Sequence, residues 1–179
     1  MDAISNVRSC ALNPVSLLVL AVALHLTVDH FQAIRAYAEH TYPHECCGLL
    51  LGMKRQTIGD ISHTVLELWP TQNAWTVEAA ALTESPHTFT STRRYWIDPK
   101  DMLAAQRYAQ HHQFDIIGIY HSHPDHPAVP SECDRTLAWS GYSYVIVSVP
   151  QGSAQDLLSW SLDNYQQFQP EAVVLTDGE

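Results

Sequence analysis

The chain has 179 residues, of which 46% are hydrophobic and 16% charged, and its formal net charge is −10 at pH 7. These values are typical of one globular domain and exclude a disordered chain. Lysine and arginine form no block along the sequence, so nucleic acid is not expected as a partner.

The first apolar segment, Val15 to Leu24, has only ten residues, whereas a membrane-spanning helix needs about 20. It could be the apolar part of a signal peptide, but Asp2 precedes it and no clean cleavage site follows. A start codon assigned too far upstream, or a terminal helix or strand, would also explain it. We predict an N-terminal extension over residues 1–25 and one domain over 26–179, without a membrane partner.

Four cysteines are present, and they show neither a C-x-x-C pair nor a regular framework. Proteins of the cytoplasm keep such thiols reduced, whereas disulfides form in oxidising compartments. We therefore expect a cytoplasmic protein.

Strands and helices are predicted to alternate from the end of this segment onward. A short strand over 26–29 leads into a helix from His30 to about His40, with Asp29 as its N-cap. The next elements are an apolar strand over 46–51 closed by Gly52, a strand over 61–69, a long loop over 71–92 and a short strand over 95–97.

The second half of the chain repeats this alternation. Asp98 and Pro99 predict a helix start, since Asp is a good N-cap and Pro suits the first helical position. This helix runs towards His112, and Ser131 starts a shorter one. Strands are predicted over 114–120, 142–149, 157–162 and 172–176. The pattern indicates one α/β (α+β) domain built on a mixed sheet.

Two histidines follow the apolar strand over 114–120. His121 and His123 are two residues apart, so on a strand both imidazoles point to the same face. With Asp134, they form the ligand set of a catalytic zinc site that leaves a fourth position to water. An H-x-H pair by itself also occurs on surfaces, and Cys133 is either a rival ligand or a small buried residue.

Hydrolysis at such a site also needs a group that moves protons to and from the reacting atoms. Glu45 is the candidate, because it precedes the apolar strand over 46–51. If this strand neighbours the one over 114–120, Glu45 lies near the metal; otherwise it is a solvated loop residue. Ser131 and Asp134 fit the capping pattern S-x-x-[DE], so Ser131 is a helix cap, a catalytic residue, or both.

Glu45, followed by H-x-H-x(7)-S-x-x-D from His121 to Asp134, resembles the JAMM (MPN+) motif of zinc isopeptidases. The segments YPHECCGLLLG, RRYWIDPKDMLAAQRYA, IIGIYHSHPDHPAVPSECD and AWSGYSYVIVSV also resemble a bacterial branch of this family. That branch includes peptidases that remove cysteine from the C-terminus of a ubiquitin-like sulfur carrier. The resemblance covers roughly residues 26–163 and implies a mixed, curved sheet flanked by helices, related to cytidine deaminases.

The resemblance also implies a role for each motif residue. One zinc ion per chain would be held by His121, His123 and Asp134. Glu45 would act as general base and acid, and Ser131 would stabilise the oxyanion of the tetrahedral intermediate.

The substrate implied by the resemblance is a small ubiquitin-like or sulfur-carrier protein, cut at a peptide or isopeptide bond of its C-terminal tail. The alternatives are a non-catalytic MPN-type scaffold that binds a protein, and a peptidase acting on short peptides or ubiquitin-like conjugates. Arg93 and Arg94 either pair with a substrate carboxylate or are solvated. The stretch over 74–92 is longer than the family pattern, which bears on the substrate more than on catalysis.

Overall fold

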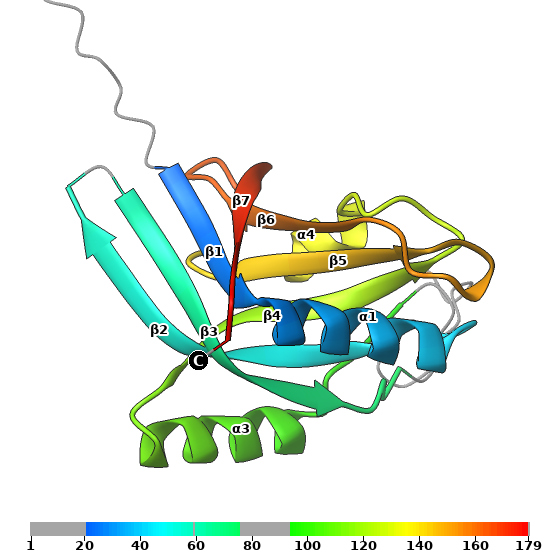
Figure 1. Ribbon diagram of the computed structural model, residues 1–179, viewed down its shortest axis with the longest axis horizontal. Helices are drawn as coiled ribbons and strands as arrows, with labels where there is room; N and C mark the ends of the chain where they lie inside the picture. Colours follow the sequence, from blue (N-terminus) through cyan, green and yellow to red (C-terminus); the bar gives the residue numbers. More distant parts are fainter. Residues whose placement is uncertain (1–20, 59, 76–93, 179) are drawn as a thin grey trace, which may run out of the picture.

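Seven strands of the computed structural model close into a barrel, in the order β1-β3-β2-β4-β5-β6-β7 (Figure 1). The structure describes residues 21–58, 60–75 and 94–178. The strands are β1 (Ala21–Thr27), β2 (Cys47–Thr57), β3 (Asp60–Thr71), β4 (Asp115–Pro124), β5 (Ser143–Val149), β6 (Leu157–Leu162) and β7 (Phe168–Thr176). The helices are α1 (Val28–Thr41), α3 (Pro99–His111) and α4 (Glu132–Leu137), with a 3-10 turn at Pro150–Gly152. A single α+β domain with a mixed sheet and flanking helices, as predicted, is confirmed.

The sheet is mixed because β1 pairs in parallel with both β3 and β7, and β4 pairs in parallel with β5. The other neighbouring strands are antiparallel. β4 lies between β2 and β5 and is buried on both faces, so residues 116–120 form an apolar run before the polar end of the strand. No helix among the described residues is long and apolar enough to cross a membrane.

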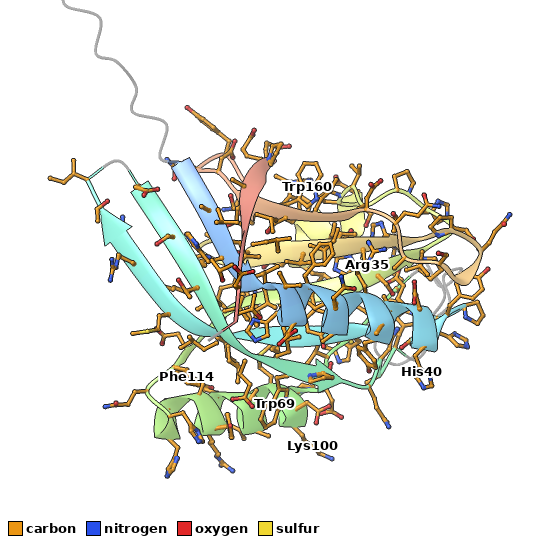
Figure 2. All side chains as sticks on the ribbon, in the orientation of Figure 1. Arg35, His40, Trp69, Lys100, Phe114 and Trp160 are labelled. Atoms are coloured by element: carbon orange, nitrogen blue, oxygen red, sulfur yellow. The ribbon has the colours of Figure 1, made fainter. Side chains whose placement is uncertain are left out.

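Two apolar clusters cover the two faces of the central strands. On one face, Ile34 of α1 packs with Leu50 of β2 inside a cluster that fills the barrel. On the other face, Ala105 of α3 packs with Leu49 in a second cluster. Trp69 of β3 packs against this second cluster where α3 meets the sheet (Figure 2). Adjacent residues of β2 therefore serve opposite faces, as the two-residue period of a strand requires.

The N-terminal boundary differs from the prediction. β1 begins at Ala21, so residues 21–25 of the predicted extension belong to the sheet, where they pair with β3. α1 begins at Val28, because the Thr27 hydroxyl accepts a hydrogen bond from His30 N at 3.1 Å. Asp29, predicted as the N-cap, lies in the first turn instead. Residues 1–20, with most of the apolar segment over 15–24, lie outside the described residues.

Gly52 does not end its strand, contrary to the prediction. β2 continues to Thr57, and its register with β3 shifts between Leu51 and Gly52. A Cβ atom on Gly52 would lie 2.0 Å from the backbone oxygen of Thr64, so a glycine is needed for this close approach.

Residues 95–97, predicted as a strand, form none. Most of the predicted loop over 71–92 lies outside the described residues.

The remaining predicted elements are present with shifted ends. Asp98 caps α3, accepting from Lys100 N at 2.8 Å, and Ser131 caps α4. β4 runs on from the predicted 120 to Pro124, and β7 begins at Phe168 rather than Ala172. The extension of β4 places both histidines of the predicted metal site within the strand itself.

A buried polar group lies among the strands of the barrel. The Ser143 and Ser159 hydroxyls both donate to the carboxyl group of Glu171, and Ser143 is 2.7 Å from His63 Nδ1. His63 Nδ1 is 4.0 Å from Glu171 Oε1. Burial raises the pKa of Glu171 to about 7, although the two serine hydroxyls act in the opposite direction. The buried carboxyl group therefore holds its proton up to near-neutral pH.

This shift predicts the pH dependence of stability. Between pH 4.5 and 7 the native protein keeps a proton on Glu171 that the unfolded chain releases, so stability falls as pH rises. The loss amounts to about 3 kcal/mol. Glu171→Gln keeps the shape of the side chain but cannot titrate. The variant's stability relative to the wild type should therefore rise by about 3 kcal/mol between pH 4.5 and 8. Urea unfolding at both pH values measures the difference, and parallel pH profiles would contradict the assignment.

Candidate metal centre

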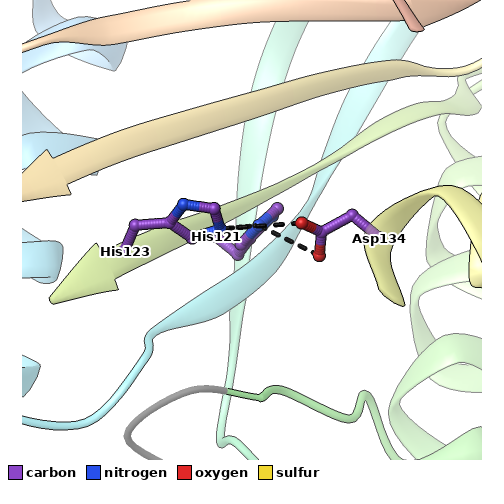
Figure 3. A group of neighbouring side chains, drawn as sticks. All are labelled: His121, His123 and Asp134. Atoms are coloured by element: carbon purple, nitrogen blue, oxygen red, sulfur yellow. Dashed lines mark hydrogen bonds and ion pairs between the residues drawn. The ribbon is translucent and has the colours of Figure 1, made fainter. Parts of the chain in front are cut away.

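Three side chains that can ligate a metal converge at one end of β4. His121 and His123 point to the same face of the strand, and Asp134 reaches them from the first turn of α4 (Figure 3). The two Nε2 atoms are 3.1 Å apart. Asp134 Oδ1 is 3.5 Å from His121 Nε2, and Oδ2 is 3.6 Å from His123 Nε2. The structure thus brings together the three residues predicted to hold zinc.

The hydrogen bonds around these side chains favour a cation. His123 Nδ1 is 2.9 Å from the Pro127 carbonyl, to which it can only donate, so in the neutral ring Nε2 carries the lone pair. His121 is fully buried, and Tyr95 stacks on its ring with centroids 4.5 Å apart. Two imidazole nitrogens and a carboxylate, facing one another at this range, can share one cation, either a proton or a metal ion. The donor set fits zinc.

The first turn of α4 fixes Asp134. The Ser131 hydroxyl accepts from Asp134 N at 3.2 Å, and Ser131 N donates to Asp134 Oδ2 at 2.6 Å. Burial alone would raise the pKa of Asp134, but His121, His123 and a hydrogen bond with the Ser131 side chain outweigh it and lower the pKa. Ser131 is therefore a helix cap, and its reciprocal bond with Asp134 holds the carboxylate towards the imidazoles.

Glu45 is placed beside the histidines by the pairing of β2 with β4. Cys47 is opposite His121, and the pairing continues one step further. Cys46 N donates to the Ser122 hydroxyl at 2.9 Å, and Ser122 N donates to the Cys46 carbonyl at 3.2 Å. The next position of the chain is Glu45, which therefore lies next to His123. The strands predicted to carry these residues are neighbours, which was the condition for Glu45 to approach the site.

The environment of Glu45 favours a protonated carboxyl group. The side chain is buried, and burial raises its pKa to about 8. The charges of His123 and Arg94 lower the pKa and that of Asp134 raises it, but burial has the largest effect. A carboxyl group with such a pKa can both release and take up a proton near neutral pH.

A cavity of about 290 Å³ opens in front of these groups. Its described walls are formed by Glu45, Arg94, His123, His126, Pro127, Val129, Ser131 and Asp134. Arg94, one of the two arginines proposed to contact substrate, is on this wall, whereas Arg93 lies outside the described residues. Cys133 is half-buried and does not belong to the convergent group of three. The cavity gives a substrate access to Glu45 and Ser131 together with His123 and Asp134, whereas His121 is buried behind them.

Comparison with known proteins gives the family. Residues 27–163 match the family described as prokaryotic homologs of the JAB domain. The chain belongs to this family. The JAMM/MPN resemblance of the sequence is thereby confirmed, and the match covers the three candidate metal ligands together with Glu45.

Three known proteins are similar to this JAB-domain protein. Desampylase of Haloferax volcanii is 29% identical over 127 residues, which cover 70% of this chain and 76% of that protein. Tail tip assembly protein K of Escherichia phage N15 is 30% identical over 136 residues, covering 73% of this chain but only 42% of the phage protein. The solution structure of protein DSY2949 from Desulfitobacterium hafniense has a TM-score of 0.66 and 25% identity, covering 87% of this chain and 94% of that one.

Several residues that support the JAB-domain site were not singled out from the sequence. Ser122 joins β2 to β4 from between the two histidines, and Tyr95 covers His121. Trp160 Nε1 donates to the Ala128 carbonyl at 3.0 Å and fastens the loop before α4 to β6 (Figure 2). The serine of H-S-H offered a signal, because a polar residue on the core-facing side of a buried strand needs a hydrogen-bond partner.

Proposed function

We propose that this JAB-domain protein is a zinc-dependent hydrolase. It would cut a peptide or isopeptide bond in the C-terminal tail of a small ubiquitin-like or sulfur-carrier protein. The observation that carries the proposal is a cavity whose walls include a buried, protonatable Glu45 together with His123 and Asp134, two of the three convergent side chains. The similarity to a desampylase supports a ubiquitin-like substrate.

His121, His123 and Asp134 would hold the zinc ion. When bound, zinc lowers the pKa of a water molecule and polarises a carbonyl group. The chain keeps two of these side chains in place, His123 through the Pro127 carbonyl and Asp134 through the backbone of Ser131. Because these partners are backbone groups, the ligand geometry does not depend on flexible side chains.

Glu45 would move the proton in this reaction. Its carboxylate accepts a proton from the attacking water and donates it to the nitrogen of the departing amine. Its raised pKa keeps the two protonation states close in free energy near neutral pH. Its burial also restricts exchange of that proton with bulk water.

Ser131 would stabilise the negative charge that develops on the carbonyl oxygen. The hydroxyl oxygen accepts from Asp134 N, and its O–H group, which pairs with the Asp134 carboxylate at the wall of the cavity, is the donor that would turn to this oxygen.

Ser131→Ala is expected to slow turnover about 10²–10³-fold, the usual effect of losing one oxyanion donor. Stability should fall by about 1 kcal/mol, because the α4 cap is also lost. Zinc content should stay the same, since the bond to Asp134 Oδ2 comes from the Ser131 backbone. Ser131→Thr keeps the hydroxyl and is the matched control. Steady-state kinetics would contradict this role if the alanine variant were no slower than the threonine variant.

The function itself is tested by incubating the zinc-loaded protein with two kinds of substrate. One is a panel of sulfur-carrier and ubiquitin-like proteins with single-residue C-terminal extensions, and the other is a lysine-linked conjugate of such a protein. Intact mass then shows the loss of the extension or the release of the partner. A zinc-loaded protein that cuts neither, while binding the carrier tightly, would indicate a scaffold instead.

A further inference from the structure

The imidazole of His121 lacks the hydrogen bond that orients its neighbour. Its Nδ1 is buried and has no hydrogen-bond partner among the described residues, whereas Nδ1 of His123 is 2.9 Å from the Pro127 carbonyl. A histidine that ligates a metal usually has its second nitrogen fixed in this way. The ring of His121 is instead covered by the ring of Tyr95, with centroids 4.5 Å apart and planes inclined by 28°. The direction of the His121 ring therefore depends on where Tyr95 is held.

The side chain of Asn73 holds the backbone on both sides of Tyr95. Its Nδ2 donates to the Arg94 carbonyl at 2.9 Å, and its Oδ1 accepts from Trp96 N at 3.1 Å. These two groups belong to the peptide units that precede and follow Tyr95. Ala74 N also donates to the Trp96 carbonyl at 2.9 Å, which ties the chain after β3 to the same segment. One amide side chain thus fixes both peptide units that carry the Tyr95 ring.

The same amide holds the peptide unit that follows Glu45. Asn73 Nδ2 donates to the Glu45 carbonyl at 3.0 Å. The N–H group at the other end of this unit belongs to Cys46 and donates to the Ser122 hydroxyl at 2.9 Å. A peptide unit is planar, so bonds at its two ends leave it little freedom to rotate. Because Ser122 lies between the two histidines on β4, the backbone of Glu45 is fixed relative to the strand that carries them.

From these contacts we infer that Asn73 is a positioning residue, which sets the spacing between the proposed proton carrier Glu45 and the proposed metal ligand His121. It acts on Glu45 through the backbone and on His121 through Tyr95. Asn73 is not among the described residues that line the cavity, so this role needs no contact with a substrate. The inference rests on the proposed function, since the spacing matters for turnover only if Glu45 moves a proton beside the metal site.

Asn73→Ala is expected to lower kcat about 10–100-fold at saturating zinc and to leave KM nearly unchanged, because misplacing the proton carrier removes no substrate contact. Asn73→Asp is the second variant. Its ionised carboxylate still accepts from the N–H groups of Trp75 and Trp96 but cannot donate to a carbonyl, so it should also be slow even if the alanine variant folds poorly. Gln72→Ala truncates the exposed neighbouring residue and should match the wild type.

The shared peptide unit also predicts that Asn73 and Ser122 are coupled. Loss of either bond frees the unit that follows Glu45, so losing the second bond should add little. Asn73→Ala combined with Ser122→Ala should therefore slow turnover by clearly less than the product of the two single effects. Two unrelated structural losses would multiply, and that result would overturn the inference.

NMR of the metal-free protein tests the positioning without turnover. In the wild type, the ring current of Tyr95 should move the His121 ring protons upfield. Asn73→Ala should lose most of this shift. It should also speed exchange of the Cys46 amide about 5–10-fold more than that of the β5 amides, as expected when about one hydrogen bond of local stability is lost. Gln72→Ala should change neither signal.

These measurements separate the inference from the proposed function. If the wild type cuts no substrate, the proposed function fails, and the His121 shift and Cys46 exchange still decide whether Asn73 holds both residues. Slow turnover of Asn73→Ala with an unchanged His121 shift and unchanged Cys46 exchange would overturn the inference and leave the proposed function standing. Altered NMR signals with normal turnover would overturn it as well.

Discussion

Glu45→Gln is expected to reduce turnover about 10²–10⁴-fold while the protein stays folded and binds one zinc ion per chain. Glutamine has the shape of the buried side chain but cannot take a proton from water or give one to an amine. The hydrogen bonds that place this residue come from the backbone of Cys46 and from Asn73, and both persist in the variant. Initial rates, zinc content by atomic absorption and thermal melting measure the three properties separately.

Glu132→Gln is the matched control for this experiment. Glu132 lies on α4, next to the site in sequence, but its side chain is 76% exposed and pairs with Arg135. An exposed ion pair contributes little to stability, so the control should behave like the wild type in all three measurements. Near-normal turnover by Glu45→Gln, at full zinc content, would remove Glu45 from proton transfer.

The local part of the site could be predicted because strand geometry determines it. Residues two positions apart on a strand point to the same face. The neighbouring imidazoles of His121 and His123 follow from that rule alone. The reciprocal bonds of Ser131 and Asp134 follow from the spacing of a capping box in the same way. Both features depend on residues close together in the chain, where the backbone period is known.

The position of Glu45 relative to the histidines could not be predicted from the sequence. Nothing local to Glu45 shows that β2 pairs with β4, or that Cys47 is opposite His121. A shift of one residue would have turned the side chains of β2 to the other face, so the position of Glu45 depends on a register that tertiary packing selects. Closure of the barrel by β1 and β7 is likewise a contact between the two ends of the described chain.

Asn73 and Gly52 show why residue type alone did not predict the structural role of a residue. An asparagine in a polar segment is usually a turn residue, yet here its amide joins two walls of the cavity. A glycine after an apolar run usually ends a strand, yet here it allows the Thr64 carbonyl to approach. In each case the role comes from a neighbour that is distant in sequence.

Asp134→Asn is expected to lower zinc affinity at least about 100-fold and to abolish turnover at low zinc. Even partners outside the direct ligands cost about 10–100-fold when they are removed, so loss of a ligand charge should cost more. Asparagine keeps an oxygen that can accept from Ser131 N, which preserves the cap of α4. The change therefore acts on the charge facing the two imidazoles, with the helix still in place.

The measurement is the rise in unfolding free energy that zinc produces. At a free zinc concentration 100 times the wild-type dissociation constant, binding stabilises the wild type by about 2.7 kcal/mol. The same concentration should stabilise Asp134→Asn by at most about 0.4 kcal/mol if its affinity is 100-fold weaker. Each protein is compared with itself in chelator, because the variant also loses the attraction between Asp134 and the histidines in the metal-free state. Glu45→Gln should retain the full zinc effect, and an undiminished effect in Asp134→Asn would exclude Asp134 as a ligand.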